Sequence, residues 1–332
     1  MMGDMAARTT TSVRDRTFAG VAAPVWGALG LVYVIWGSTY LAIREAVLTM
    51  PPFLLAAVRF LVAGSVLYAW SIRRGDRTGD RPGVRQWRAA TIAGGLLLLG
   101  GNGAVVWAEQ HIPTGVTALI IATVPLWMVL LGRLGLGERI TARESIGVLV
   151  GFGGLVLLVG LRDVGGRPLD LAGAGVAMGG AVCWATGSLY SRRAPLPKRP
   201  HVSTALQMLG GGALLLIVAA ATGEFGDLQL ERISAASWAG LAYLIVIGSW
   251  VAFNAYVWLL QNARISLVAT YAYVNPVVAV FLGWAILDER ITWIAAVAGA
   301  VIVVAVALIV SSKAPKATEV PEPIRVQGRA AG

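Results

Sequence analysis

The chain alternates between long apolar stretches and short polar connections. Ten apolar stretches of roughly 17 to 24 residues are each long enough to cross about 30 Å of hydrocarbon as an α-helix. They run near residues 25–43, 53–72, 89–108, 114–131, 145–161, 171–190, 202–221, 238–260, 266–287 and 293–310. The residue-by-residue alternation typical of membrane strands is absent, so helices are the expected spanning structure. The pattern predicts an all-α polytopic membrane protein with ten transmembrane helices.

Composition indicates that these stretches lie in a lipid bilayer. Hydrophobic residues make up 57% of the chain and charged residues 13%, and the mean hydropathy is +0.73. These values are far more apolar than those of a soluble domain. The polar residues 1–24 are predicted to form an N-terminal cytoplasmic tail. Residues 311–332, which combine prolines with charges of both signs, are predicted to form a disordered cytoplasmic tail.

The basic residues are distributed unevenly between the predicted connections. Most of the 27 Lys and Arg residues fall in alternate connections and in the two tails, and Arg59 lies within a helix. The basic residues predicted on the opposite side are Arg44, Arg162, Arg167, Arg232 and Arg290. This bias predicts that both termini are cytoplasmic. The net charge of +10 is then explained by basic loops that face anionic lipid headgroups. The charge therefore gives no reason to expect a nucleic-acid partner.

Two nearly identical six-residue segments indicate an internal repeat. Residues 136–141 read Leu-Gly-Glu-Arg-Ile-Thr, and residues 287–292, which lie 151 positions further on, read Leu-Asp-Glu-Arg-Ile-Thr. Pro125 and Pro276 are separated by the same 151 positions. Similar pairs in the same order extend back to Trp36 in the first helix, so the chain reads as one unit used twice.

The two units are predicted to span residues 25–161 and 171–310, with five helices in each. Because five is odd, the second unit must enter the membrane from the side opposite to the first. Two inverted five-helix repeats are the arrangement of many secondary transporters, which expose a site at the bilayer midplane to each side in turn. A duplicated structural bundle without a substrate is the alternative.

Several short motifs resemble a known family of transporters. They are Trp36–Tyr40, Arg59, Pro113–Gly115, Pro125, Gly137–Arg139, and Tyr271–Pro276 with Glu289. In this order they resemble the drug/metabolite transporter (DMT) superfamily and, within it, the EamA family of bacterial ten-helix permeases. The resemblance implies an inner-membrane secondary carrier with a central cavity between its halves, and export of amino acids, other small metabolites or drugs.

Polar side chains at membrane depth are the candidate functional residues, because each is unfavourable there unless it faces a cavity or a partner. Arg59 lies about six residues, or ~9 Å, from the outer end of the second helix. Its permanent charge favours a carboxylate partner, supplied by a substrate or by Glu109 or Glu45 in a fixed ion pair. Asn102 and Glu109 share a face of the third helix.

The second repeat carries polar and aromatic residues where the first is apolar. Tyr271, Tyr273 and Asn275 replace aliphatic residues of the first repeat, as expected of a site that binds an asymmetric substrate. Tyrosines packed between helices are the alternative. The predicted substrate path comprises Trp36, Tyr40, Arg59, Asn102, Glu109, Trp184, Asn254, Tyr271, Tyr273 and Asn275.

Pro125 and Pro276 are predicted hinges, since each removes a backbone hydrogen bond near the middle of a helix. In the repeated hexapeptide, Thr141 with Glu144 forms a predicted helix-capping box. Glu138 and Glu289 could instead make gate contacts at opposite membrane faces, and capping is the favoured interpretation.

Enzymatic functions find little support in the sequence. There is no Walker A loop for ATP and no His-Glu-x-x-His metal motif, so no cofactor or metal is expected. We therefore predict a secondary transporter that exports small metabolites across the bacterial cytoplasmic membrane. A passive channel or facilitator is the alternative. A proton or counter-solute as a coupling partner and the oligomeric state are left open.

Overall fold

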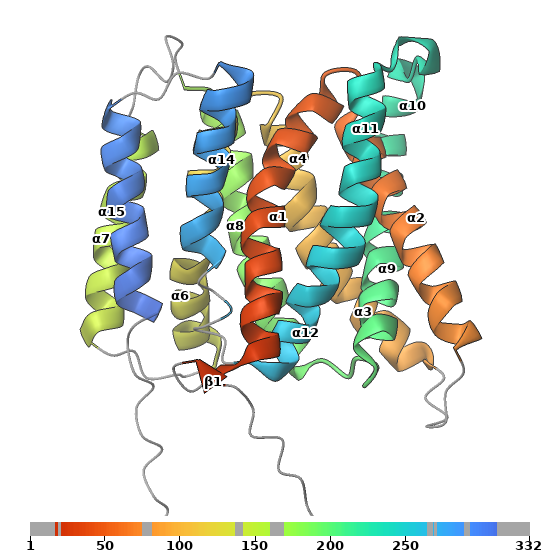
Figure 1. The fold of residues 1–332 in the computed structure, drawn as a ribbon, viewed down its shortest axis with the longest axis horizontal. Coiled ribbons are helices and arrows are strands. Elements are labelled where there is room, and N and C mark those ends of the chain that lie inside the picture. The colour runs from red at the N-terminus through yellow and green to blue at the C-terminus, as the bar shows by residue number, and fades with distance from the viewer. Residues whose placement is uncertain are drawn as a thin grey trace, which may run out of the picture.

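The computed structural model describes residues 17–18, 21–74, 82–136, 142–159, 169–263, 268, 271–288 and 293–310. Long helices run side by side across the molecule (Figure 1). Apart from helices and their connections, this part of the chain contains only the paired strands β1 (Thr17–Phe18) and β2 (Val21–Ala22). The prediction of an all-α fold for the membrane domain is confirmed.

The first half of the chain contributes eight helical elements to the described structure. They are α1 (Ala23–Val47), α2 (Pro52–Arg73), α3 (Val84–Gly94), η1 (Gly95–Gly103), α4 (Ala104–Ala108), α5 (Thr114–Ile121), α6 (Val124–Leu136) and α7 (Ala142–Val159). The elements α3, η1 and α4 follow without a break, and η1 is a π-helix. A stretch of wider turns therefore lies in the middle of one long helix.

The second half contributes nine helical elements to the described structure. They are α8 (Leu171–Arg193), α9 (Pro200–Ala221), α10 (Glu224–Asp227), η2 (Leu230–Arg232), α11 (Ala235–Tyr243), η3 (Leu244–Phe253), α12 (Asn254–Asn262), α14 (Tyr271–Leu287) and α15 (Trp293–Val310). The π-helix η3 joins α11 to α12, as η1 joins α3 to α4. Asp170 caps α8 by accepting hydrogen bonds from the backbone of Ala172 and Gly173.

Within the described residues, six helical stretches are long and apolar enough to cross a membrane. They cover Ala23–Val47, Pro52–Arg73, Val84–Ala108, Thr114–Leu134, Pro200–Ala221 and Ala235–Asn262. Large apolar side chains such as Val34, Val62 and Val277 are exposed on the outside of the bundle. An apolar outer surface suits lipid better than water. The chain is a multi-pass membrane protein.

Helices of the two halves pack on their counterparts through glycines. The helix α2 packs on α9, and α7 packs on α15. A Cβ atom added at Gly64 would lie 3.1 Å from Leu209 Cγ, and one at Gly212 would lie 3.0 Å from Leu61 Cγ. Gly64 and Gly212 are 148 positions apart in the sequence, and Leu61 and Leu209 are separated by the same 148 positions. The two contacts are therefore equivalent. We call this α2–α9 contact the glycine seam.

The approach of α3 to α9 is closer still. A Cβ atom at Gly94 would lie 2.2 Å from the backbone oxygen of Gln207, and one at Gly211 would lie 2.7 Å from the backbone oxygen of Gly94. No larger residue fits at either position without moving a helix. Small residues of this kind allow helix backbones to approach closely in a membrane, where van der Waals packing drives association.

The helical stretch that contains Pro125 is interrupted shortly before that residue. The helices α5 and α6 are separated at Ala122 and Thr123, and Pro125 is the second residue of α6. Proline has no N–H to donate to the carbonyl of Ile121, so a regular helix cannot continue through this point. Pro276 lies inside α14, and its side chain is outside the described residues.

Some predictions concern parts of the chain that the structure does not describe. Residues 137–141 and 289–292, which carry the repeated Glu-Arg-Ile-Thr, lie outside the described residues, as do residues 1–16 and 311–332. The predicted caps, gate contacts and tails therefore stay predictions.

Candidate substrate cavity

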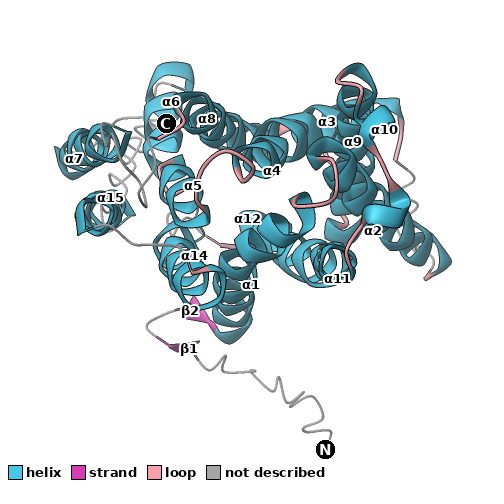
Figure 2. Ribbon diagram, turned by 90° about the horizontal axis from the view of Figure 1, so that it is seen from above, coloured by secondary structure: helices cyan, strands magenta, loops and turns pink. Residues whose placement is uncertain are grey.

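A cavity is lined by residues of both halves of the chain. Figure 2 shows from above some of the helices that carry them, among them α1, α5, α8 and α14. It is lined by Trp36, Thr39, Tyr40, Ile43, Arg59, Gly101, Asn102, Val105, Ile121, Gly180, Trp184, Tyr271 and Asn275. The volume of the cavity is about 60 Å³, counted as the space that the centre of a water-sized sphere can occupy, and this is enough for a few water molecules. In this conformation the cavity can therefore hold only a small molecule or part of a larger one.

Arg59 forms the charged wall of the cavity. Its side chain is only 3% exposed. The guanidinium donates from Nε to Ser249 Oγ (2.9 Å) and from Nη1 to Asn102 Oδ1 (3.3 Å), and it lies over the ring of Phe60 at 4.6 Å from the centroid. Gly248 leaves space for it, because a Cβ atom there would lie 2.9 Å from Arg59 Nη2.

The carboxylates considered as ion-pair partners of Arg59 have other surroundings. Glu109 is fully buried at the end of α4, where it accepts a hydrogen bond from Thr114 Oγ1 (3.0 Å). Arg44 donates to the backbone oxygen of Glu109. Neither Glu109 nor Glu45 lines the cavity. Within the described part of the chain, no carboxylate is hydrogen-bonded to Arg59.

Aromatic rings form the other walls and one end of the cavity. The ring centroid of Trp36 lies 5.4 Å from that of Trp184, 4.8 Å from that of Tyr256 and 5.3 Å from that of Tyr271. The Trp184 indole donates to the Tyr256 hydroxyl (3.2 Å), which is also hydrogen-bonded to Ser188 (2.9 Å). With Phe253, these four rings form the aromatic cluster.

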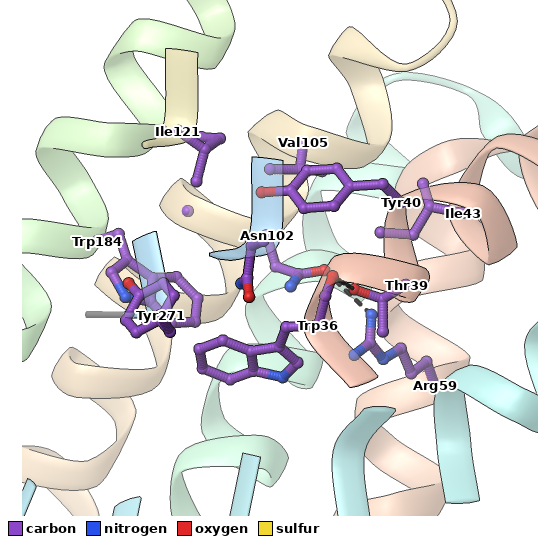
Figure 3. Close-up of a pocket in the computed structure, with 13 residues that line it drawn as sticks. Trp36, Thr39, Tyr40, Ile43, Arg59, Asn102, Val105, Ile121, Trp184 and Tyr271 are labelled. Atoms are coloured by element: carbon purple, nitrogen blue, oxygen red, sulfur yellow. Dashed lines mark hydrogen bonds between the residues drawn. The ribbon is translucent and has the colours of Figure 1, made fainter. Parts of the chain in front are cut away.

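The cavity extends to one side of this cluster only. From Trp36 its lining continues along α1 through Tyr40 to Ile43, and along the third long helix from Asn102 to Val105. Both helices run in this direction toward their ends at Val47 and Ala108. Figure 3 shows Tyr40 and Val105 above Trp36 in the lined space. The aromatic cluster therefore closes one end of a cavity that extends toward a single face.

Asn275 both lines the cavity and joins two helices. With its amide nitrogen placed toward the neighbouring carbonyls, the side chain donates to the backbone oxygens of Tyr33 (3.1 Å) and Tyr271 (3.2 Å). The contact with Tyr33 ties α14 to α1. Tyr271 faces the cavity, whereas the side chain of Tyr273 lies outside the described residues.

Asn254 and Gln207 lie apart from the cavity. Asn254 is hydrogen-bonded to His201 Nδ1 and accepts from Thr204 Oγ1 (3.3 Å). Gln207 is 1% exposed and donates from Nε2 to Ser203 Oγ (3.1 Å). Asn254 lies 152 positions after Asn102, one more than the spacing of the repeated hexapeptide, and is its counterpart in the second repeat. The structure thus separates the two repeat-related asparagines.

Seven of the ten residues predicted for the substrate path line the cavity together. They are Trp36, Tyr40, Arg59, Asn102, Trp184, Tyr271 and Asn275. Sequence reasoning missed Ser249 and Tyr256. Tyr256 lies 151 positions after Val105, so the spacing of the repeat could have indicated another polar aromatic residue unique to the second copy. Across the described ranges, no three His, Cys, Asp or Glu side chains are grouped as metal ligands.

Comparison with known proteins agrees with this architecture. The model of the EamA-like transporter family matches residues 25–160 and 171–311. A protein of Escherichia coli K12 named "Uncharacterized inner membrane transporter YedA" is 39% identical over 292 residues, which are 87% of this chain and 92% of that protein. "Uncharacterized transporter YvbV" of Bacillus subtilis is 25% identical over 88% of this chain and 93% of its own.

A solved crystal structure has the same fold. It superimposes with a TM-score of 0.61 at 23% identity and covers 86% of this chain and 95% of its own. The helical bundle and its cavity define a multi-pass membrane transporter. The chain belongs to the EamA-like transporter family, of which it contains two copies of the domain. The resemblance noted from the sequence motifs is confirmed.

Proposed function

We propose that this protein is a secondary transporter that exports small metabolites across the bacterial cytoplasmic membrane by alternating access. The observation that carries the proposal is the cavity that both halves build and that the aromatic cluster closes at one end. A site that is accessible from one side at a time is the requirement for alternating access.

The arrangement of the helices supports two inverted repeats of five spanning helices each. The glycine seam pairs α2 with its own counterpart α9 through equivalent contacts. The start of α8 lies beside the end of α4, since a Cβ atom at Gly173 would lie 2.9 Å from His111 Cβ. Arg44, near the end of α1, also contacts the end of α4. The second repeat therefore begins at the face where the first helix of the first repeat ends.

The orientation follows from the charge pattern. The start of α1 and the end of α15 lie on the same face of the bundle (Figure 1). Most of the basic residues belong to connections on that face and to the two tails, so we place both termini in the cytoplasm. With the termini on that side, the cavity extends toward the outer side, and we propose that this conformation is an outward-facing state.

The cargo we propose is a small amphipathic compound, such as an amino acid or a related metabolite, with drugs as the alternative. The rings of Trp36, Trp184 and Tyr271 offer apolar surface, and Arg59 and Asn102 offer polar contacts within the same cavity. The name of the E. coli relative also describes that protein as an inner membrane transporter. Export is what the resemblance to the EamA permeases implies.

Counterflow in proteoliposomes tests the proposal. Vesicles are loaded with one unlabelled amino acid or organic cation per batch, and entry of the labelled compound is followed over time. A carrier gives saturable, transient accumulation of the label. Flux that does not saturate and does not depend on the unlabelled compound inside would favour the passive channel instead.

A matched pair of glycine variants ties the flux to the cavity. In Gly101→Leu the added side chain begins 2.7 Å from Trp184 Cε3 and fills cavity space, so counterflow is expected to be lost. In Gly179→Leu the added Cβ atom meets nothing within 4 Å, and counterflow should stay at the wild-type level. Size-exclusion chromatography establishes that both variants are folded. Equal counterflow by both would exclude this cavity as the path.

A further inference from the structure

Arg59 is a buried cation whose hydrogen-bond partners are neutral. A guanidinium has five N–H groups, and the two bonds to Ser249 and Asn102 occupy two of them. The remaining three have no acceptor among the residues that the structure describes. A charge at this depth in a membrane protein is strongly unfavourable unless an opposite charge or a polar environment compensates it. The cavity is the open side from which a compensating anion can reach Arg59.

We infer that the transported molecule carries a single carboxylate, which binds to Arg59 beside Asn102 while its apolar part packs against Trp36, Trp184 and Tyr271. This inference rests on the proposed transport function and specifies its substrate class. Figure 3 shows the arrangement, with Arg59 on one side of the cavity and Trp184 and Tyr271 on the other. The substrate is therefore an organic monoanion or a zwitterion, and organic cations are not substrates.

The number of charges in the cavity wall favours a carboxylate over a phosphate ester. Arg59 is the one cationic side chain among the lining residues, all of which are described. A single negative charge neutralises it, whereas a phosphate dianion would leave a second charge buried without a partner. The planar fork of the guanidinium also matches the two oxygens of a carboxylate.

The apolar walls indicate what the carboxylate is attached to. The lining rings of Trp36, Trp184 and Tyr271 are each less than a tenth exposed and already pack edge to face on one another. An additional ring or a branched aliphatic group can extend this packing and remove further apolar surface from water. The cavity thus separates a cationic end from an apolar end, as an amphipathic carboxylate requires.

Ligand-induced thermal stabilisation of the purified full-length protein in detergent tests the inference with simple aromatic probes in place of the natural cargo. The probes are 3-phenylpropionate, L-phenylalanine, L-phenylalaninamide, phenethylamine and phenyl phosphate, which share one ring and differ in charge. Binding to the folded state raises the unfolding temperature in proportion to ln(1 + [L]/Kd). The two carboxylates are expected to stabilise the protein, and the amide, the amine and the phosphate to bind at least tenfold more weakly.

Three variants assign the effect to Arg59. Arg59→Gln is expected to weaken carboxylate binding at least tenfold, and Arg59→Lys to keep part of it, because the charge remains without the fork. Arg232→Gln removes an exposed charge from η2 that is not part of the cavity lining, and this variant should bind both carboxylates like the wild type. If Arg59→Gln does not fold, the comparison of the five probes on the wild-type protein still decides.

Several results would overturn the inference. Stabilisation by the amine or the amide that equals that of the carboxylates would remove the carboxylate requirement, and failure of both carboxylates to bind folded protein would do the same. Preference for phenyl phosphate would replace the carboxylate by a phosphate. Counterflow of cations alone would leave the proposed transport function standing and refute only the substrate class. Conversely, carboxylate binding that depends on Arg59 without any counterflow would refute transport and keep the binding site.

Discussion

The glycine seam and the cavity use the repeat in opposite ways. In the seam, Gly64 and Gly212 make equivalent contacts with Leu209 and Leu61, so each half supplies the same chemistry. In the cavity, Arg59 of the first half lines the wall. Its counterpart Gln207, which lies 148 positions later in the sequence, has a neutral side chain and does not line the cavity. Backbone packing is thus shared between the halves and side-chain chemistry is not.

The difference follows from what each region has to do. If the two repeats exchange conformations during transport, a helix contact between counterparts must fit in both states, which favours equivalent residues on its two sides. A small substrate has no two-fold symmetry, so its site gains nothing from equivalent residues. Each of the following predictions compares one half with the other or with a matched control.

The largest effect is expected in the seam itself. Gly64→Val and Gly212→Val should each destabilise the protein by about 1–3 kcal/mol, because the added methyl groups overpack the interface between α2 and α9. The two losses should be equal within error. Apparent melting temperatures in detergent measure them, with Gly179→Val, which faces open space, as the control. A loss confined to one of the two glycines would contradict the equivalence of the halves.

The hydroxyl of Tyr256 belongs to the second half alone, because Val105 occupies the equivalent position. Tyr256→Phe removes the acceptor of the Trp184 indole N–H and should lower stability by about 1–2 kcal/mol. It should also loosen the closed end of the cavity and accelerate counterflow. Tyr243→Phe, which loses a hydrogen bond to Ser38 outside the cluster, should leave the counterflow rate unchanged. Equal rates for Tyr256→Phe and the wild type would exclude a barrier role.

The two repeat-related asparagines should differ in ligand binding. Asn102→Ala removes the acceptor that positions Arg59 and should weaken binding of 3-phenylpropionate about threefold to tenfold, the usual effect of losing one hydrogen bond. Asn254→Ala, whose partners are His201 and Thr204, should leave this affinity unchanged. Isothermal titration of both variants measures the difference. Equal losses would place Asn254 on the path after all.

The smallest effect concerns Glu224, in the connection between α9 and α11. Its carboxylate accepts hydrogen bonds from the backbone of Phe53 and Leu54 at the start of α2. Burial raises the pKa of Glu224 above its ordinary value of 4.5, and Asp227 adds to this, while the two hydrogen bonds oppose it. The folded state therefore binds the proton more tightly than the unfolded state, and stability falls as the pH rises through the window above about 4.5.

Replacing this carboxylate should remove that dependence. Melting temperatures of Glu224→Gln between pH 4 and 7 should fall less with rising pH than those of the wild type, and Glu231→Gln, at an exposed position nearby, should follow the wild type. A steeper fall for Glu224→Gln would reverse the sign of the argument.

Much of the helical framework was predictable because apolar length determines it. The second apolar stretch, predicted near 53–72, is α2 at Pro52–Arg73, and the last one, predicted near 293–310, is α15 with the same bounds. The wide turns of η1 and η3 were not predictable. In a helix that is apolar on all sides, the hydrophobic pattern does not reveal how many residues each turn contains. The number of ten spanning helices stays a prediction.

The residues that line the cavity were predictable where the depth of a residue in the membrane is enough to identify it. Trp36 lies near the middle of α1, Arg59 lies about two turns inside α2 and Tyr271 begins α14, and the fold brings the three together. Glu109 lies just past the end of the third long helix at Ala108, as the predicted bounds place it, and it does not line the cavity. Tyr256 was missed because the face that an apolar helix turns to its neighbours depends on the packing of the whole bundle.

The π-helices η1 and η3 have a consequence for how such a protein can move. A π turn is an α turn with one residue added, so it can shift along a helix as one residue leaves it and another joins. A shift past a given residue turns that residue about 100° around the helix axis. Asn102 lies in η1 and Ser249 in η3, and both are bonded to Arg59. Rotation of the residues in these two π-helices would therefore break both hydrogen bonds of Arg59, while the ends of the helices keep their depth in the membrane.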